Sequence, residues 1–388
     1  MSYKSLKELP RTKFTDSLVS NRRVGTSVLR CHIDMGQAMR YCAISAVLFL
    51  AGACTDAAAP PVPPPPSNVH LLALETFDGS GQAVHPDAAI TPTEWGGSET
   101  ELFATPYPNG DATKENPSLF ARRSQLEWLV PPGVKNPIES PDVGYLSDPD
   151  DVFNPETGEL WLYYRAVTNT NDIFLVRGTA PTMWSAPRLV ARGPNHTIVS
   201  PTVVRRAQGD WLMWSVNSGA AGCTSASTTV ELRTSTDGIT WSAPVTTDLS
   251  EGTLFAWHID VQWIPSRSEF WATYNVKVPG SCTTAALHFA KSVDGVHWDI
   301  APGAILVRGA TPAFSDIVYR ASLLYDQPSD NITLWYSGAT FADSRYTWRI
   351  ATETMTAAEF FARVEGLSSA GTTPSVTTAP PLTDATAP

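Results

Sequence analysis

The chain has 388 residues, of which 43% are hydrophobic and 17% are charged, and its formal net charge is −11. A chain of this length and composition can bury a large core and shows no bias towards disorder over its middle. Its negative charge repels phosphate backbones, so we expect no nucleic-acid partner. The 13 Trp, 25 Gly and 32 Pro, with many short runs of Thr, Val, Tyr and Trp, favour strands and turns over long helices.

Residues 1–53 are predicted to be an upstream extension followed by an export signal. A basic residue precedes an apolar run over 41–51, which is too short to span a bilayer as a helix of roughly 20 residues. Two small residues and Cys54 follow. This arrangement resembles the signal of bacterial lipoproteins, which implies cleavage before Cys54 and acylation of its thiol; cleavage by an ordinary signal peptidase is the alternative. We expect an exported protein held at the cell envelope by a lipid anchor only.

The segments that flank the predicted domain have compositions that cannot pack a core. Residues 54–67 include a proline-rich run over 60–66, which is typical of a stiff polyproline linker. Residues 366–388 are rich in Thr, Ala, Ser and Pro and are predicted to be a disordered tail. The folded domain is therefore expected over residues 68–365.

The predicted domain contains an internal repeat of about 57 residues. Its marker is a series of tryptophans separated by 56, 57 and 57 residues, namely Trp128, Trp184, Trp241 and Trp298. The last two end similar phrases, STDGITW and SVDGVHW, in which Asp-Gly is typical of a hairpin turn. A second phrase recurs upstream, for example at 154–164 and 264–274. Each unit is predicted to be a four-stranded antiparallel blade, and five units predict an all-β, five-bladed β-propeller.

The repeat assigns structural roles to several other residues. Asp237 and Asp294 are predicted turn residues, and the mid-strand tryptophans are predicted to fill the blade cores, namely Trp161, Trp214, Trp271 and Trp335. The last unit lacks the repeated Trp, and residues 356–364 are expected to form a short helix or irregular strand. Residues 69–77 are expected to supply a strand that pairs with the last blade and closes the ring.

Two cysteines occupy matching places in consecutive units. Cys223 and Cys282 both fall between the second and third strands of their units. In an exported domain this favours a disulfide that joins blades three and four, with two separate buried thiols as the alternative.

Each unit opens its innermost strand on a related triplet, and such strand starts converge around one mouth of a propeller channel. The triplets are residues 85–87, 148–150, 200–202, 258–260 and 320–322. Their third position would gather Asp87, Asp150 and Asp260 from three blades. Crowding of carboxylates raises the pKa of one of them, which supplies the acid that cleavage of a glycosidic bond requires.

The chain resembles the furanosidase-type glycoside hydrolases of families 43, 32 and 117 and the mannoside phosphorylases over residues of about 85 to 355. The resemblance rests on the Asp-Pro-type blade openings, the Asp-Gly-x-x-Trp turns and the count of five blades. The resemblance implies a glycan-processing enzyme, with Asp87 as the base and Asp150 or Asp260 as the second functional carboxylate. Substrate binding is assigned to the neighbouring polar and aromatic residues, namely His85, Asp148, Trp257, His258 and Arg320. No blade opens on the Glu-Gly-Pro-like motif that usually donates the proton, and Glu115 precedes the third strand of its unit, away from the blade openings.

Other interpretations of the same residues remain open. Asp at a strand start commonly caps backbone N–H groups, and three such carboxylates could hold a structural Ca²⁺. A catalytically silent propeller that binds glycan or protein at the cell surface is the alternative function. The sequence has no Cys/His cluster for zinc and no phosphate-binding Gly loop, so we expect no cofactor and no catalytic metal, and a monomer whose ligand is carbohydrate.

Overall fold

The structure is a computed structural model that describes residues 69–92, 95, 100–122, 124, 127–249, 255–277, 279–282, 284–309, 311 and 314–369. The predicted export signal, Cys54 and the Pro-rich linker lie outside the described residues, as do residues 370–388 of the predicted tail. In the part of the chain that is described, no helix combines the length and the apolar character of a membrane span.

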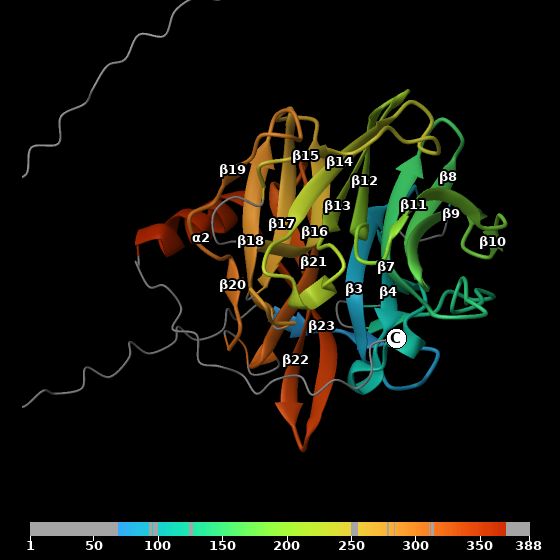
Figure 1. The fold of residues 1–388 in the computed structure, drawn as a ribbon, viewed down its shortest axis with the longest axis horizontal. Coiled ribbons are helices and arrows are strands. Elements are labelled where there is room, and N and C mark those ends of the chain that lie inside the picture. The colour runs from blue at the N-terminus through green and yellow to red at the C-terminus, as the bar shows by residue number, and fades with distance from the viewer. Residues whose placement is uncertain are drawn as a thin grey trace, which may run out of the picture. The chain divides into compact units, whose positions relative to one another are not determined.

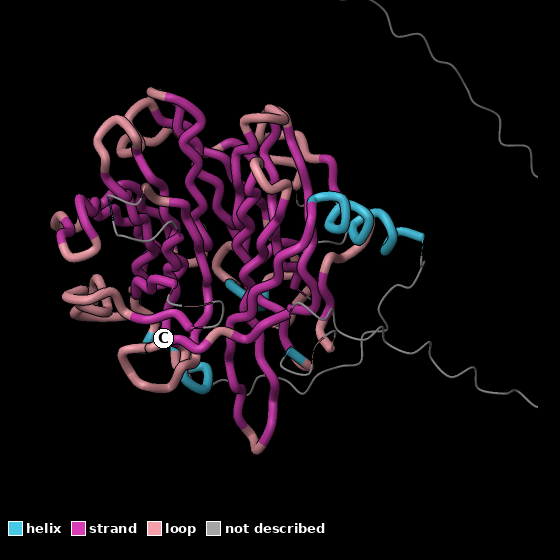
Figure 2. Tube along the Cα trace, turned by 180° about the vertical axis from the view of Figure 1, so that it is seen from behind, coloured by secondary structure: helices cyan, strands magenta, loops and turns pink. Residues whose placement is uncertain are grey.

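Five sheets follow one another along the chain, and together they form the predicted five-bladed β-propeller (Figures 1 and 2). Blade one comprises β3 (Ala83–Ile90), β4 (Thr100–Pro106), β5 (Ser118–Arg122) and β6 (Glu127–Leu129). Blade two comprises β7 (Tyr145–Asn154), β8 (Glu159–Val167), β9 (Thr170–Ala180), β10 (Met183–Trp184) and β11 (Arg188–Pro194). Blade three comprises β12 (Val199–Ala207), β13 (Asp210–Asn217), β14 (Thr229–Ser235) and β15 (Val245–Thr246). Blade four comprises β16 (Phe255–Ile264), β17 (Glu269–Lys277), β18 (Thr284–Ser292), β19 (Asp299–Ile300) and β20 (Leu306–Val307), and blade five comprises β21 (Ile317–Asp326), β22 (Asn331–Ala342) and β23 (Arg345–Thr356).

The N-terminal segment of the domain closes the ring, as predicted. Strand β1 (Val69–Leu71) pairs antiparallel with β23 and gives blade five its fourth strand. Strand β2 (Ala73–Leu74) then pairs with β6 of blade one. A single short segment therefore covers the outer edges of the first and last blades. The short helix or irregular strand expected over residues 356–364 is a helix, α2 (Ala357–Ser369). This helix extends to residue 369 and so includes the first residues of the segment that was predicted to be a disordered tail.

The Asp-Gly turns recur because they pack against the preceding blade. The Trp214 indole N–H donates to the Gly295 carbonyl at 2.8 Å, and the Tyr163 hydroxyl donates to the Gly238 carbonyl at the same distance. A Cβ atom at Gly295 would lie 2.6 Å from the Trp214 ring, and the residue has a φ of +79°. Asp294 accepts backbone N–H groups within its own turn. Glycine at these positions is thus required by both backbone conformation and close packing.

The blade cores and the disulfide agree with the sequence analysis. The mid-strand tryptophans are 0–5% exposed, namely Trp161, Trp214, Trp271 and Trp335. Cys223 and Cys282 form a disulfide between blades three and four.

Every innermost strand carries an irregularity at or just before its opening triplet. The pairing register with the second strand shifts across the first two triplet residues in blades one to three, across residues 319–320 in blade five, and at Trp257, just before the triplet, in blade four. His85, Asp148 and Ser200 also have positive φ values of 54°, 50° and 51°. Such bulges turn a side chain out of the regular alternation of a strand, so His85, Asp148 and Ser200 do not follow the direction that the strand pattern predicts.

The third position of each triplet ties its blade to the next one. In each blade the side chain at this position accepts a backbone N–H from the following blade. From blade one to blade five the contacts are Asp151 N–H to Asp87 at 2.6 Å, Val203 N–H to Asp150 at 2.7 Å, Val261 N–H to Thr202 at 3.0 Å, Leu323 N–H to Asp260 at 3.2 Å and Ala88 N–H to Ser322 at 3.3 Å. This closed set of five contacts, here called the ring, satisfies backbone donors of innermost strands that have no neighbour within their own sheet on the inner side.

Candidate active site

The opening triplets place polar side chains in two adjacent layers at one end of the channel. The first position supplies the upper layer, namely His85, Asp148, His258 and Arg320, and the third position supplies the carboxylates of the ring. Arg320 connects the layers, because its guanidinium lies 3.9 Å from Asp148 Oδ1 and 3.5 Å from Asp150 Oδ1. The structure therefore brings together all the triplet residues that the sequence singled out.

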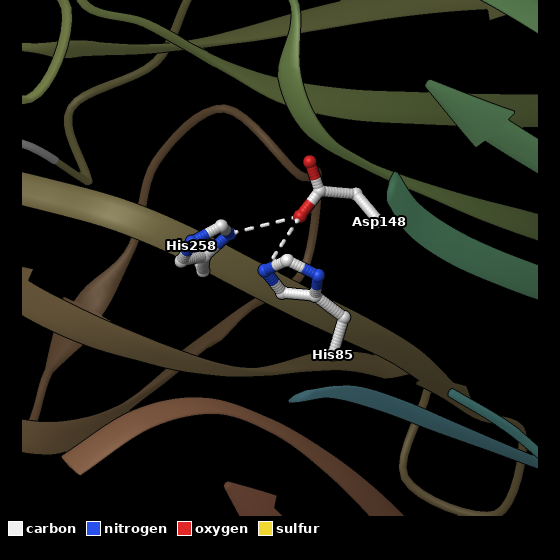
Figure 3. A group of neighbouring side chains, drawn as sticks. All are labelled: His85, Asp148 and His258. Carbon is white, nitrogen blue, oxygen red and sulfur yellow. Dashed lines mark ion pairs between the residues drawn. The ribbon is translucent and has the colours of Figure 1, made fainter. Parts of the chain in front are cut away.

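Two histidines converge on a single carboxylate oxygen in the upper layer (Figure 3). His85 Nε2 lies 3.3 Å and His258 Nδ1 lies 3.1 Å from Asp148 Oδ1. The three side chains come from blades one, two and four, and none is more than 3% exposed. Burial lowers the pKa of both histidines, so both rings are neutral at pH 7. A neutral imidazole offers a nitrogen lone pair, which is the form that binds metal ions.

Asp148 is held as a carboxylate by its surroundings. Burial alone would raise the pKa of Asp148, but Arg165 and the two histidines together hold it well below its usual range. Arg165 Nε lies 2.8 Å from Asp148 Oδ2 and also donates to the Ser147 hydroxyl at 3.0 Å. One carboxylate oxygen thus binds Arg165, while the other faces the histidines.

Glu115 belongs to this site, although the sequence analysis placed it away from the blade openings. It follows the 3₁₀ helix η2 (Ala112–Lys114), and its Oε2 atom lies 3.2 Å from His85 Nδ1. Burial raises the pKa of Glu115, while its contact with His85 opposes that shift. The sequence did contain a signal for this position of Glu115. Strand β4 runs antiparallel to β3, so it ends near the mouth, and the loop that carries Glu115 must begin there. Arg165 was missed as well, and it lies at the mouth end of β8 opposite Ser147.

The carboxylates of the ring form a second cluster. Asp87, Asp150 and Asp260 offer oxygen atoms that all lie within 4.8 Å of one another, and they line a cavity of about 340 Å³. Burial and the neighbouring Asp87 raise the pKa of Asp150 and Asp260 well above the usual range. Their hydrogen bonds to the next blade match the capping alternative, and their predicted catalytic role stays a prediction.

The remaining predicted residues flank the upper layer. Trp257 is half-buried, its ring meets His258 edge-on at 5.7 Å, and its indole N–H donates to the Tyr319 hydroxyl at 3.2 Å. Tyr319 in turn meets the His258 ring at 4.4 Å. Arg320 is only 1% exposed, and its guanidinium lies between Asp148 of the upper layer and Asp150 of the ring. Aromatic side chains therefore form the wall of the site on the side of blades four and five.

A curated relative matches a large part of the sequence. The chain is 27% identical over 307 residues to the "A type blood N-acetyl-alpha-D-galactosamine deacetylase" of Flavonifractor plautii, which covers 66% of this chain and 40% of the relative. The chain thus spans about two fifths of that relative's length. No protein-family model matches the chain.

Solved structures share the fold. An N-acetylgalactosamine deacetylase from F. plautii, in complex with blood group B trisaccharide, has a TM-score of 0.69 at 23% identity over 79% of this chain and 98% of that chain. The α-L-arabinofuranosidase of Podospora anserina, in complex with cellotriose, has a TM-score of 0.51 at 12% identity over 74% of this chain and 98% of that chain. The catalytic domain of the family GH62 α-L-arabinofuranosidase of Coprinopsis cinerea has a TM-score of 0.50 at 14% identity, with the same coverage. The chain is therefore a five-bladed β-propeller of the type on which these carbohydrate-active enzymes are built.

Proposed function

We propose that this protein is a metal-dependent carbohydrate deacetylase, which hydrolyses the N-acetyl group of a terminal amino sugar at the upper layer of the mouth. One observation carries the proposal. His85 Nε2 and His258 Nδ1 are buried 3.3 and 3.1 Å from Asp148 Oδ1, yet none of these three atoms makes a hydrogen bond of regular geometry, and the three side chains offer ligand atoms within 4.8 Å of one another. Buried polar atoms without partners are costly, and a divalent cation bound between these three would remove that cost.

The residue types fit such an ion. Two imidazoles and one carboxylate form a ligand set for catalytic divalent metals, and three protein ligands leave positions for water and substrate. Glu115 lies at the Nδ1 side of His85, which leaves Nε2 for the ion. Arg165 fixes the Asp148 carboxylate through its other oxygen. The sequence analysis expected no catalytic metal, and this proposal departs from that expectation.

The chemistry is amide hydrolysis. A bound metal ion would polarise the acetyl carbonyl and lower the pKa of a water molecule. The oxygen of water bonds to the acetyl carbon, the C–N bond breaks, and the nitrogen leaves as an amine that takes up a proton. The products are acetate and the free amino sugar. In this scheme His85, Asp148 and His258 would hold the ion, while Glu115 holds the His85 ring and Arg165 holds the Asp148 carboxylate in position.

The choice of an N-acetyl substrate is supported by the match to the deacetylase of F. plautii. We therefore propose a non-reducing terminal N-acetylgalactosamine as the substrate unit. The Trp257 and Tyr319 rings beside His258 provide apolar surface for a sugar face.

The test is to supply purified protein with Zn²⁺, Mn²⁺ or Ca²⁺ singly and to incubate it with the type A blood-group trisaccharide. Acetate, free amine and released monosaccharide are then measured separately. We expect acetate and amine in equal amounts, no cleavage of the sugar chain, and loss of the activity on chelation. Asp148→Asn should lower the rate by at least about 100-fold and abolish metal binding, whereas Asp210→Asn, which alters an exposed ion pair with Arg206, should change neither. Release of monosaccharide without acetate would reject the proposal.

Glycoside hydrolysis through the ring remains the second candidate, because three carboxylates lie together there and two of them have raised pKa values. In that case the same assay yields monosaccharide, and Asp87→Asn removes the turnover while folding is preserved. A propeller that only binds glycan would give neither product with any added metal.

We further propose that the protein acts at the outside of the cell envelope, anchored through a lipid on Cys54. The support is the apolar run and the small residues before Cys54 in the sequence. Labelling with a fatty-acid analogue should tag the wild-type protein but not Cys54→Ser, and equal labelling of both would reject the anchor.

A further inference from the structure

The hairpin between β22 and β23 extends beyond its own sheet. Both strands are 12 residues long, whereas the neighbouring strand β21 pairs with β22 only as far as Ala339. Residues 340–347 therefore form a two-stranded extension, which projects from the mouth end of the blade (Figures 1 and 2). Asp343 and Ser344 have φ values of 53° and 60°, as a tight hairpin turn with two left-handed residues requires.

One face of this extension is aromatic. Phe341 pairs directly with Tyr346 across the hairpin, and their ring centroids are 4.8 Å apart. The Tyr346 ring lies 6.2 Å from that of Trp348, which pairs with Ala339 on the same face. Trp348 also meets the rings of Tyr107 and Tyr319 at 5.1 and 5.3 Å. Two-stranded hairpins are marginally stable by themselves, so these contacts explain how the extension is held at the rim of the mouth.

The aromatic row leads into the candidate active site. Tyr319 meets the His258 ring at 4.4 Å and the His85 ring at 5.4 Å. A continuous series of rings therefore runs from the tip of the hairpin to the two histidines, through Tyr346, Trp348 and Tyr319. Each step in this series is between 4.4 and 6.2 Å.

A structural role, support of the hairpin, explains why Tyr346, Trp348 and Tyr319 are aromatic. It does not explain the aromatic ring of Phe341 at the tip. Trp348 is 5% exposed, whereas Phe341 is 39% exposed, and its one ring contact within the described residues is with Tyr346. The tip carries Asp343 and Arg345, and the Phe341 backbone N–H donates to the Asp316 carboxylate at 2.7 Å, so charges of both signs flank the ring and polar groups lie beside it. An exposed aromatic ring flanked by polar groups suits a sugar, which has an apolar face and hydroxyl groups at its edge.

We propose that Phe341 and Tyr346 form an extension subsite, which binds the sugar units next to the one that reacts at His85, Asp148 and His258. This proposal rests on the proposed function, because it takes the reacting unit to be bound at the upper layer. It makes the protein selective for oligosaccharide ends over free monosaccharides. The inner aromatic rings hold the hairpin at the rim of the mouth, so that the subsite keeps its place relative to the reacting unit.

The test compares one substitution on two substrates. Phe341→Ala should lower kcat/KM for the type A blood-group trisaccharide by about tenfold, since one stacking contact is lost, and should leave kcat/KM for free N-acetylgalactosamine unchanged. Phe77→Ala is the matched control, because Phe77 is 40% exposed and lies in the N-terminal segment between β2 and β3. An equal effect on both substrates, or no effect on either, would overturn the subsite.

A binding measurement separates this proposal from the proposed function. Saturation-transfer NMR on the chelated protein needs no turnover, and it should show the trisaccharide bound through more than one sugar unit, with the contacts of the outer units lost in Phe341→Ala. If no substrate is turned over but this pattern is found, the deacetylase proposal fails and the subsite stands. If acetate is released but Phe341→Ala binds and reacts as the wild type does, the subsite fails alone. Concentration-dependent dimerisation that Phe341→Ala abolishes would instead assign the tip to contact between two copies and would overturn the subsite.

Discussion

Ionisation of Glu101 should cost this protein stability at neutral pH. Glu101 lies in β4 on the same face as Phe103, it is 0% exposed, and neither of its carboxyl oxygens has a hydrogen-bond partner. Burial raises the pKa of Glu101 to about 8, from an ordinary value of 4.5. At pH 6–7 the folded state therefore keeps a proton that the unfolded state has released.

The sign and size of the effect follow from this difference. Because the folded protein binds more protons than the unfolded chain between pH 4.5 and 8, its free energy of unfolding falls as the pH rises through that window. At about 1.4 kcal/mol per pKa unit, the loss between pH 5 and pH 7 is on the order of 2–3 kcal/mol. Glu101→Gln removes the ionisation while keeping the shape, so the variant should be more stable than the wild type at pH 7 by about that amount and nearly equal to it at pH 5.

The assay is urea unfolding at pH 5, 6 and 7, with the difference between variant and wild type taken at each pH so that other titrating groups cancel. Glu127→Gln is the control, since Glu127 lies on β6 of the same blade and is exposed. A difference between Glu101→Gln and wild type that stays constant from pH 5 to pH 7 would show that Glu101 does not hold the extra proton.

Three further predictions concern packing and the two layers of the mouth. Gly295→Ala should destabilise the fold by more than about 2 kcal/mol, because its Cβ would meet Trp214, whereas Gly158→Ala, also at positive φ but with open space around it, should cost about 1 kcal/mol; equal changes in melting temperature would contradict the packing argument. Replacing Cys223 and Cys282 by Ser opens a bridge with a sequence separation of 59 and should lower stability by about 2–4 kcal/mol in thermal unfolding, and an unchanged melting temperature would refute this. Asp260→Asn keeps an acceptor for the Leu323 N–H, so deacetylase activity should stay within about threefold of wild type, and a loss above about 100-fold would place the chemistry in the ring.

The repeat made the fold predictable from the sequence, because the features that repeat are the ones each blade needs to pack on its neighbour. Gly238 and Gly295 recur since a hydrogen bond from the preceding blade reaches each of their carbonyls. The cysteine pair and the closing strand could be placed for the same reason, once the register of the blades was known. A property shared by all blades is visible as a period in a single sequence.

The site was less predictable, because its chemistry comes from features that do not repeat. Glu115 lies beside a short 3₁₀ helix in blade one, and among the described residues no other blade supplies a cation to this site from the strand position that Arg165 occupies. The bulges at His85 and Asp148, with positive φ, also turn these side chains in a direction that strand alternation does not predict. The sequence analysis therefore placed the active site at the third position of the triplets, where the carboxylates are. The structure instead has buried polar atoms without regular hydrogen bonds at the first position, on His85, Asp148 and His258.

The triplet separates two tasks that would conflict if one residue performed both. Its third residue must be a short acceptor in every blade, because the ring closes only if Asp, Thr or Ser receives the N–H of the next blade. Its first residue carries no such requirement in blades one, two and four, and there it is His85, Asp148 and His258. Ser200 shows the contrast, since its hydroxyl binds the backbone N–H and carbonyl of Ile259 in the next blade and takes no part in the cluster. Substitutions at the first position should therefore change chemistry at little cost in stability, while substitutions at the third should do the reverse.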